Sequence, residues 1–367
     1  MTNPKPFAPS WVSAPGDTIA DLLEERGWTS ASLAERLGVT PKHTSELLHG
    51  KATISADTAG RLSLVLGSSP EFWLTREAQY RAGLERRSAT AALEGQSAWL
   101  TELPLAWMVR QGWVPRLASK GEQVGECLRW FGVASVDAWR TTYAAPLAAW
   151  RASKRLEKKP AAVAAWMRRA ELQAAELRCA PFDLTGFKRA LREARSLTCE
   201  DQPEIFIPRL QTACAAQGVA VVFVPAPPGC PISGATKWLS PEKALLALSL
   251  RYKADDHLWF SFYHEGGHLV LHGKKLLFVE GIDGLEPDAE AEADRFARDL
   301  LVPPAAAERV RHLMTEGEIT ECARDLGVSP GVIVGRMQHE KWVPFSHFNQ
   351  LKARYSWVGD TTGVDDG

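Results

Sequence analysis

One five-residue motif constrains this chain more than any other feature: residues 264–268 read HEGGH. Two histidines four residues apart, His264 and His268, lie on the same face of an α-helix, one turn apart. Both imidazoles can therefore reach one zinc ion at about 2.0–2.1 Å. Glu265 lies one residue round from that face, where a carboxylate can act as a general base on water without binding the metal. The motif predicts the centre of a metal-dependent peptidase.

The residues around the motif strengthen this interpretation, because HExxH alone also occurs by chance. The segment Trp259–Gly273 is apolar on several faces, which is typical of a buried helix. Two adjacent glycines, Gly266 and Gly267, cost a helix interior roughly 1.5–2 kcal/mol relative to alanine. We expect them to let a substrate or a neighbouring strand approach the backbone closely.

A second helix is predicted over Pro287–Pro303, with Asp288 as its N-cap. Glu290 and Asp294 are four residues apart and share a face, whereas Glu292 points elsewhere. Glu290 would complete a His-His-Glu set with an open fourth position, as catalytic zinc requires, and Glu292 is the alternative ligand. Asp294 is expected to accept the free N–H of a ligating histidine. An ordinary acidic helix start, favoured by the helix dipole, is the other explanation.

The two segments in this order resemble the ImmA/IrrE family of metallo-endopeptidases. The resemblance is carried by His264–His268 with Leu269–His272, and by Glu290–Ala297 with Leu300–Pro303. It covers roughly Phe187 to Trp342 and departs from the family pattern at Asp294, where the family often has asparagine. The resemblance implies a zinc-dependent, gluzincin-like fold and, for several members, limited cleavage of a helix-turn-helix repressor.

An independent signal lies near the N-terminus. Thr29 is a predicted N-cap before the amphipathic segment Ser30–Leu37, and Gly38 permits a tight turn. Thr40 and Pro41 open the next helix, because proline at the first helical position loses no hydrogen bond. Two helices joined by a short glycine-bearing turn predict a helix-turn-helix, whose second helix reads the major groove.

The candidate DNA-binding residues are Lys42, His43, Ser45, Glu46 and Lys51. Lys42, His43 and Glu46 would face the groove, and Ser45 and Lys51 would contact phosphates. A solvated surface position explains His43 and Glu46 equally well. A helical hairpin used for protein contacts is the alternative for the whole unit.

The wider stretch Pro15–Tyr80 resembles the HigA-type antitoxins of the Xre-like repressor class. The matching residues include Pro15–Gly16, Leu33–Val39, Ser45–Lys51, Ile54 and Leu66–Leu74. The resemblance implies a five-helix DNA-binding domain that usually dimerises on a palindromic operator. We therefore expect double-stranded operator DNA as a partner, and a homodimer.

The sequence as a whole predicts a multidomain, mainly α fold with a small α+β part. The expected segments are an all-α helix-turn-helix domain at 11–85, a helical connector at 86–185, a zinc peptidase domain with a small β-sheet at 186–345, and a tail at 346–367. Strands are expected at Val219–Pro225, Ile232–Trp238 and Leu245–Arg251, with Ile232–Trp238 as an edge that receives an extended substrate. Asp255 or Asp256 is the expected N-cap of the metal helix.

Composition sets the cellular context. At 367 residues and 45% hydrophobic content, the chain can build two or three cores, and no apolar run is long enough to cross a membrane. Met1–Ser10 has three prolines and no apolar core, unlike a signal peptide. The formal charge of −1 argues against indiscriminate nucleic-acid binding. These features predict a cytoplasmic protein.

Several positions stay open from the sequence alone. Arg336, His339, His347 and Tyr263 are candidates for stabilising an oxyanion. Cys230 could in principle cap the zinc or sense oxidation, although a buried structural thiol is the simpler interpretation. Residues 319–337 have a sequence pattern similar to that of the first helix-turn-helix, and we expect them to have a packing role.

The resulting hypothesis is a DNA-binding transcriptional regulator with a zinc endopeptidase domain. Its substrate would be a repressor, an antitoxin or its own chain, in a stress, phage or toxin–antitoxin response. The alternative is a non-proteolytic HigA-like antitoxin or repressor whose metal site is structural or sensory.

Overall fold

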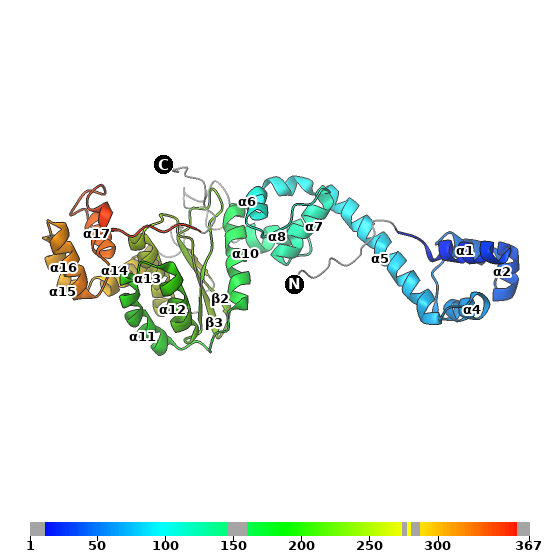
Figure 1. Cartoon of the computed structure of the whole chain (residues 1–367), viewed down its shortest axis with the longest axis horizontal. Coiled ribbons are helices and arrows are strands. Elements are labelled where there is room, and N and C mark those ends of the chain that lie inside the picture. The colour runs from blue at the N-terminus through cyan, green and yellow to red at the C-terminus, as the bar shows by residue number, and fades with distance from the viewer. Residues whose placement is uncertain (1–11, 145–159, 274–276, 280–286, 358–367) are drawn as a thin grey trace. The chain divides into compact units, whose positions relative to one another are not determined.

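The computed structural model describes residues 12–144, 160–273, 277–279 and 287–357, so Met1–Ser10 lies outside the described residues. The chain divides into two compact units: Met1–Ser97 with Leu117–Gly125, and Ala98–Arg116 with Glu126–Gly367. Helices dominate both units, and a small sheet lies in the second (Figure 1). The predicted multidomain, mainly α fold class is confirmed. The division into four segments stays a prediction.

The first unit contains five helices within its described part: α1 (Pro15–Arg26), α2 (Ser30–Leu37), α3 (Pro41–Leu48), α4 (Ala56–Leu66) and α5 (Pro70–Glu94). Thr29 and Thr40 cap α2 and α3 as predicted, each accepting a backbone N–H three residues on. Gly38 adopts the left-handed conformation with φ 67° and ends α2. The helix-turn-helix therefore forms from local signals that the sequence carries.

Two contacts fix the orientation of α3 within this unit. Gly16 of α1 lies against the end of α3, where an added Cβ would come within 2.0 Å of the Leu48 carbonyl oxygen. Arg81 of α5 donates to the carbonyl oxygens of Gly50 and Ala52 at 3.1 and 3.2 Å. The neighbouring helices thus hold both α3 and the turn that follows it.

The helices of the second unit are named here with their bounds. Before the sheet and around it lie α6 (Leu105–Arg110), α7 (Lys120–Phe131, which begins in the first unit), α8 (Val136–Trp139), α10 (Pro160–Glu176), α11 (Leu184–Glu193) and α12 (Pro203–Ala215). The later helices are α13 (Asp255–Leu271), α14 (Pro287–Leu301), α15 (Pro304–Arg311), α16 (Glu316–Leu326) and α17 (Pro330–His339).

The sheet has the strand order β1-β3-β2-β4. Its strands are β1 (Val219–Phe223), β2 (Gly234–Ser240), β3 (Lys243–Leu248) and β4 (Leu277–Val279). β1 is parallel to β3, and β2 is antiparallel to both β3 and β4. The three expected strands form. The expected open edge at Ile232–Trp238 is wrong over Ala235–Lys237, because β4 pairs there.

Helices cover both faces of this sheet (Figure 1). α10 packs on β1 and β3 from one side, and α12 and α13 pack from the other. Polar contacts anchor α10: Trp166 Nε1 donates to the Val224 carbonyl at 2.9 Å, and Lys237 Nζ lies 2.6 Å from Glu171 Oε1. α10, which the sequence analysis places in the helical connector, therefore covers one face of the sheet.

The N-terminus of α13 is a buried polar junction. Its N-cap is Ala254, so the prediction of Asp255 or Asp256 at this position is wrong by one or two residues. Asp255 instead accepts a hydrogen bond from the Ser329 hydroxyl at 2.8 Å. Asp256 pairs with Lys352 at 2.6 Å, with each side chain 6% exposed. Residues just after position 346, predicted as a tail, thus pack against α13.

Burial raises the pKa of Asp255 from 3.8 to about 6. The folded chain therefore binds this proton more tightly than the unfolded chain. The stabilisation is fully present below pH 3.8 and is lost as the pH rises through about 6. We predict that the unfolding free energy falls across this window by up to about 3 kcal/mol more in the wild type than in Asp255→Asn. Urea unfolding at several pH values checks this, and identical pH profiles would contradict it.

The second helix-turn-helix pattern forms the corresponding backbone. Gly327 has φ 66° between α16 and α17. However, α17 is buried along Gly331–Val334 and at Met337, and it packs against α13. This arrangement agrees with the expected packing role. In the described part of the chain, no helix is long and apolar enough to span a membrane.

Candidate functional site

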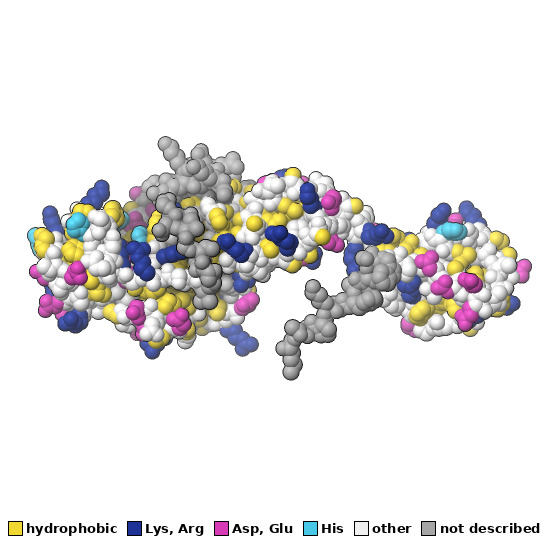
Figure 2. Space-filling view, turned by 45° about the horizontal axis from the view of Figure 1, so that its top comes forward, with side chains coloured by type: hydrophobic (Ala, Val, Ile, Leu, Met, Phe, Trp, Pro, Cys, Tyr) yellow, Lys and Arg dark blue, Asp and Glu magenta, His cyan; other side chains and the backbone are white. Residues whose placement is uncertain are grey.

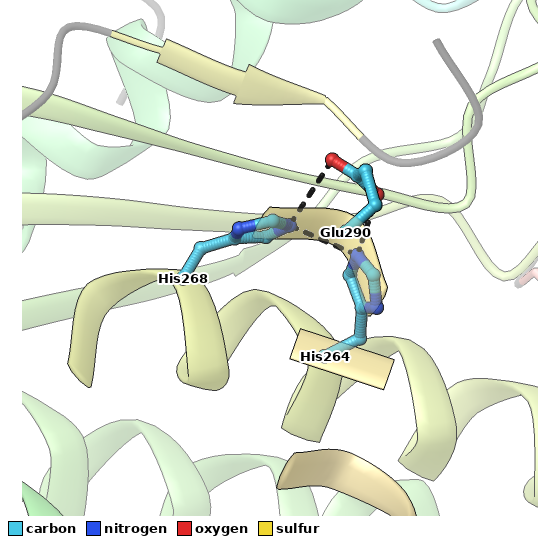
Figure 3. Close-up of side chains that lie close together, drawn as sticks. All are labelled: His264, His268 and Glu290. Atoms are coloured by element: carbon cyan, nitrogen blue, oxygen red, sulfur yellow. Dashed lines mark hydrogen bonds and ion pairs between the residues drawn. The ribbon is translucent and has the colours of Figure 1, made fainter. Parts of the chain in front are cut away.

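The centre of the motif lies inside the core, on α13. His264, Glu265 and His268 are 2%, 0% and 0% exposed. The two histidines project from successive turns, and their Nε2 atoms lie 3.0 Å apart (Figure 3). The helix thus presents both imidazoles to one point, as the spacing predicts.

The paired glycines have a different role from the one expected. An added Cβ at Gly266 would lie 3.1 Å from the Leu191 side chain of α11. At Gly267 it would lie 3.1 Å from Phe296 and 3.3 Å from Ala293 Cα, both on α14. The glycines therefore admit neighbouring helices rather than a substrate or a strand. The close contact of α14 with α13 brings its acidic first turn to the histidines.

Glu290 is the carboxylate that α14 places there. Its Oε2 lies 3.3 Å from His264 Nε2, and its Oε1 lies 3.4 Å from His268 Nε2 (Figure 3). Among the described residues, these three form the group of potential metal ligands whose donor atoms all lie within 4.8 Å of one another. Asp288 lies inside the first turn of α14, so its prediction as N-cap is wrong, since the helix begins at Pro287.

The protonation of the two imidazoles determines whether their Nε2 atoms can bind a metal. His264 Nδ1 lies 2.8 Å from Asp294 Oδ1, which as a carboxylate can only accept, so this nitrogen carries the proton. Burial, with His264 and His272 nearby, lowers the pKa of His268 from 6.5 to about 2. His268 is therefore neutral in this arrangement, and a neutral His264 with its proton on Nδ1 offers a lone pair at Nε2.

The group fits a bound zinc ion. Two nitrogens held at 2.0–2.1 Å in tetrahedral geometry lie about 3.3 Å apart, close to the contacts here. Glu290 Oε1 is buried without a hydrogen bond from the described residues. A carboxylate facing nitrogen lone pairs is repulsive unless a cation lies between them. The donor set, two imidazole nitrogens and one carboxylate, is the set that catalytic zinc takes.

Glu265 lies against the first residue of β2. An added Cβ at Gly234 would lie 2.7 Å from Glu265 Cγ and 3.0 Å from its Oε1. The strand therefore limits where this carboxylate can go. Sequence reasoning missed Gly234, because the only hint of its role was a glycine within the predicted strand Ile232–Trp238.

The remaining candidates lie in varied places. Tyr263 is fully buried, and its hydroxyl donates to the Leu191 carbonyl at 3.2 Å. Arg336 and His339 line a pocket of about 410 Å³ that Asp294 also borders. His347 lies beside Phe348.

The surroundings of Cys230 and Glu292 bear on their predicted roles. Burial raises the pKa of Cys230 to about 12, which disfavours the thiolate and agrees with a structural thiol. Glu292, the alternative ligand, lies 3.1 Å from His272 Nε2 instead.

The candidate DNA contacts lie on and just after α3. Lys42, Ser45 and Lys51 are exposed, and His43 and Glu46 are half-buried. Lys42 lies 4.0 Å from Glu46 on the next turn. Thr44 and Leu47 bury the opposite side of the helix. On this unit, basic and acidic side chains are interspersed over the visible face (Figure 2).

One family model matches residues in each of the two units. Residues 19–73 match a family model described as helix-turn-helix, and residues 218–338 match one described as IrrE N-terminal-like domain. The second match contains α13 and α14 with all three members of the donor group.

Three similar proteins each match a short part of this chain. An uncharacterised HTH-type transcriptional regulator, YddM, of Escherichia coli is 40% identical over 60 residues, which are 16% of this chain and 64% of that protein. Antitoxin HigA-1 of Vibrio cholerae is 43% identical over 54 residues, 15% of this chain and 50% of the antitoxin. Virulence-associated protein A' of Dichelobacter nodosus is 40% identical over 67 residues, 18% and 58% of the two chains.

This chain thus spans between half and two thirds of the length of these relatives. The chain therefore joins a region that matches the helix-turn-helix model, residues 19–73, to one that matches the IrrE N-terminal-like model, residues 218–338.

Proposed function

We propose that this protein is a DNA-binding regulator with a zinc-dependent endopeptidase domain. The observation that carries the proposal is the convergence of His264, His268 and Glu290, with His264 oriented by Asp294. Three protein donors leave one position of a tetrahedral ion open, which distinguishes a catalytic from a closed structural site.

Zinc, when bound, polarises a peptide carbonyl and makes water nucleophilic near neutral pH. Glu265 takes the proton from the attacking water and returns it to the leaving amine. Asp294 holds His264 in the tautomer whose Nε2 can bind the metal. Gly234 keeps Glu265 close to β2, because any larger residue would displace its carboxylate.

The substrate class follows from the joining of two functions in one chain. A helix-turn-helix reader recruits the peptidase to a promoter, where a repressor, an antitoxin or this chain itself is the nearest protein. We propose limited cleavage of such a protein in a stress, phage or toxin–antitoxin response. Lys42, His43, Ser45, Glu46 and Lys51 are the proposed contacts to operator DNA, with a homodimer on two half-sites.

Metal analysis tests the site directly. We expect about one zinc per chain in the wild type, less than a tenth of that in Glu290→Ala, and close to the wild-type content in Glu292→Ala. Inductively coupled plasma mass spectrometry on desalted protein gives the ratio. If zinc were retained in Glu290→Ala but lost in Glu292→Ala, Glu292 and not Glu290 would be the third ligand. Absence of zinc from the wild type after zinc addition would reject the peptidase.

A non-proteolytic HigA-like antitoxin or repressor is the second candidate. Two observations favour it: the HigA-1 antitoxin is similar over 54 residues, and Glu265 is fully buried. This function predicts operator binding that depends on zinc without any cleaved product. Gel-shift and mass-spectrometric measurements on the same sample, with and without a chelator, distinguish the two candidates.

A further inference from the structure

A chain of polar contacts continues outward from the metal-facing histidines. His272, the C-cap of α13, lies four residues after His268, and their Nδ1 atoms are 3.1 Å apart. On its other side, His272 Nε2 lies 3.1 Å from Glu292 Oε2 of α14. The His272 side chain is 8% exposed and the Glu292 side chain is 55% exposed, so this series of contacts leads from the core to solvent.

The contact with Glu292 determines which nitrogen of His272, and then of His268, carries the proton. An ionised glutamate can only accept a hydrogen bond, so His272 Nε2 carries a proton and donates it to Glu292. A neutral imidazole has one N–H, which makes His272 Nδ1 an acceptor. His268 Nδ1 must then be the donor, and His268 Nε2 carries the lone pair. That nitrogen faces His264 and Glu290.

The two histidines of the site are thus oriented by different means. Asp294 accepts directly from His264 at 2.8 Å. His268 Nδ1 contacts His272, which relays the charge of Glu292 to it. Carboxylate–histidine pairs that orient a metal-binding imidazole raise its basicity and fix its tautomer.

We propose that His272 and Glu292 are positioning residues that hold His268 in its metal-binding tautomer and so strengthen zinc binding. The inference rests on the proposed zinc site. It gives Glu292 a role outside the ligand set, at the end of the relay. It also explains why the side chain of a helix-capping histidine is buried at this position.

The test is the zinc affinity of the full-length protein, measured by competition with a chromogenic chelator. His272→Phe keeps a ring but offers no acceptor, and we expect zinc binding about 10–100-fold weaker. His272→Gln retains an acceptor oxygen and should recover part of that loss. Glu292→Gln removes only the exposed charge and should weaken binding by less than about tenfold.

The matched control is the exposed pair His312–Glu308, at 2.8 Å, which makes the same contact away from the site. His312→Phe should bind zinc as the wild type does. The visible spectrum of the cobalt-substituted protein provides a second readout, since loss of the relay should shift the d–d bands, whereas a general loss of stability should not. Unchanged affinity and spectrum in both His272→Phe and Glu292→Gln would overturn the relay while leaving the zinc site intact.

Two other outcomes are also decisive. If Glu292→Gln lost zinc as completely as Glu290→Ala, Glu292 would be a ligand and the relay would be wrong. If the wild type itself bound no zinc, the proposed function would fail together with the relay.

Discussion

Replacing Glu265 with glutamine is expected to lower the rate of peptide hydrolysis by about 10²–10⁴-fold, the contribution that a general acid–base typically makes. Glutamine matches glutamate in size, so it fits against Gly234, but it cannot take a proton from water. Zinc content should not change, because Glu265 lies outside the donor group. The rate is measured by mass spectrometry of cleavage products from this chain and from a reduced, unfolded carrier protein.

The control is Glu308→Gln, an equally conservative change on the exposed face of α15. It should cleave at the wild-type rate. Operator binding should be the same in both variants, because the helix-turn-helix belongs to the other unit. Equal cleavage by Glu265→Gln and the wild type would reject the proposed mechanism while leaving the zinc site to be judged by metal analysis.

Replacing Lys352 with alanine should destabilise the second unit by about 3–5 kcal/mol, because it leaves Asp256 as an uncompensated buried charge. Lys352 also donates to Gln338 at 2.7 Å, so the change disconnects the last described segment from α17 as well as from α13. Urea unfolding followed by tryptophan fluorescence measures the loss. Asp256 lies at the start of the helix that carries the histidines, so zinc affinity should fall with stability.

An exposed ion pair in the same unit provides the comparison. Arg309 and Asp325 are 2.8 Å apart and about half exposed, so Arg309→Ala should cost no more than about 1 kcal/mol. The double variant Asp256→Asn with Lys352→Met should cost less than Lys352→Ala alone, because it removes both charges together. A loss below 1 kcal/mol in Lys352→Ala would show that water reaches Asp256 and that the pair adds little.

Local signals predicted the helices well. The Thr29 and Thr40 caps, the turn at Gly38 and the proline at the start of α3 are written in neighbouring residues, and the structure has them where the sequence places them. The metal helix was also found, since apolar residues surround the motif on all sides. Errors of one or two residues arose at Asp255 and Asp288, because helix ends depend on what the flanking chain contacts.

Contacts between residues distant in sequence were harder to predict from the sequence. β4 has three residues and no strand pattern of its own, yet it pairs with β2 and closes the edge that was expected to be open. The packing of α10 on the sheet depends on Trp166 and Lys237, which belong to different predicted segments. No periodicity within either segment could reveal such a contact.

The sequence by itself determined the chemistry that is available: a histidine pair at helical spacing, a carboxylate beside it, and a second helix that carries Glu290, Glu292 and Asp294. This is possible because spacing along one helix fixes which side chains share a face. Only the tertiary structure decided which carboxylate approaches the histidines. Gly267 sets how closely α14 packs on α13, so Glu290 faces both Nε2 atoms while Glu292 is turned toward His272. The relative placement of two helices depends on packing between residues distant in sequence, which no local pattern encodes.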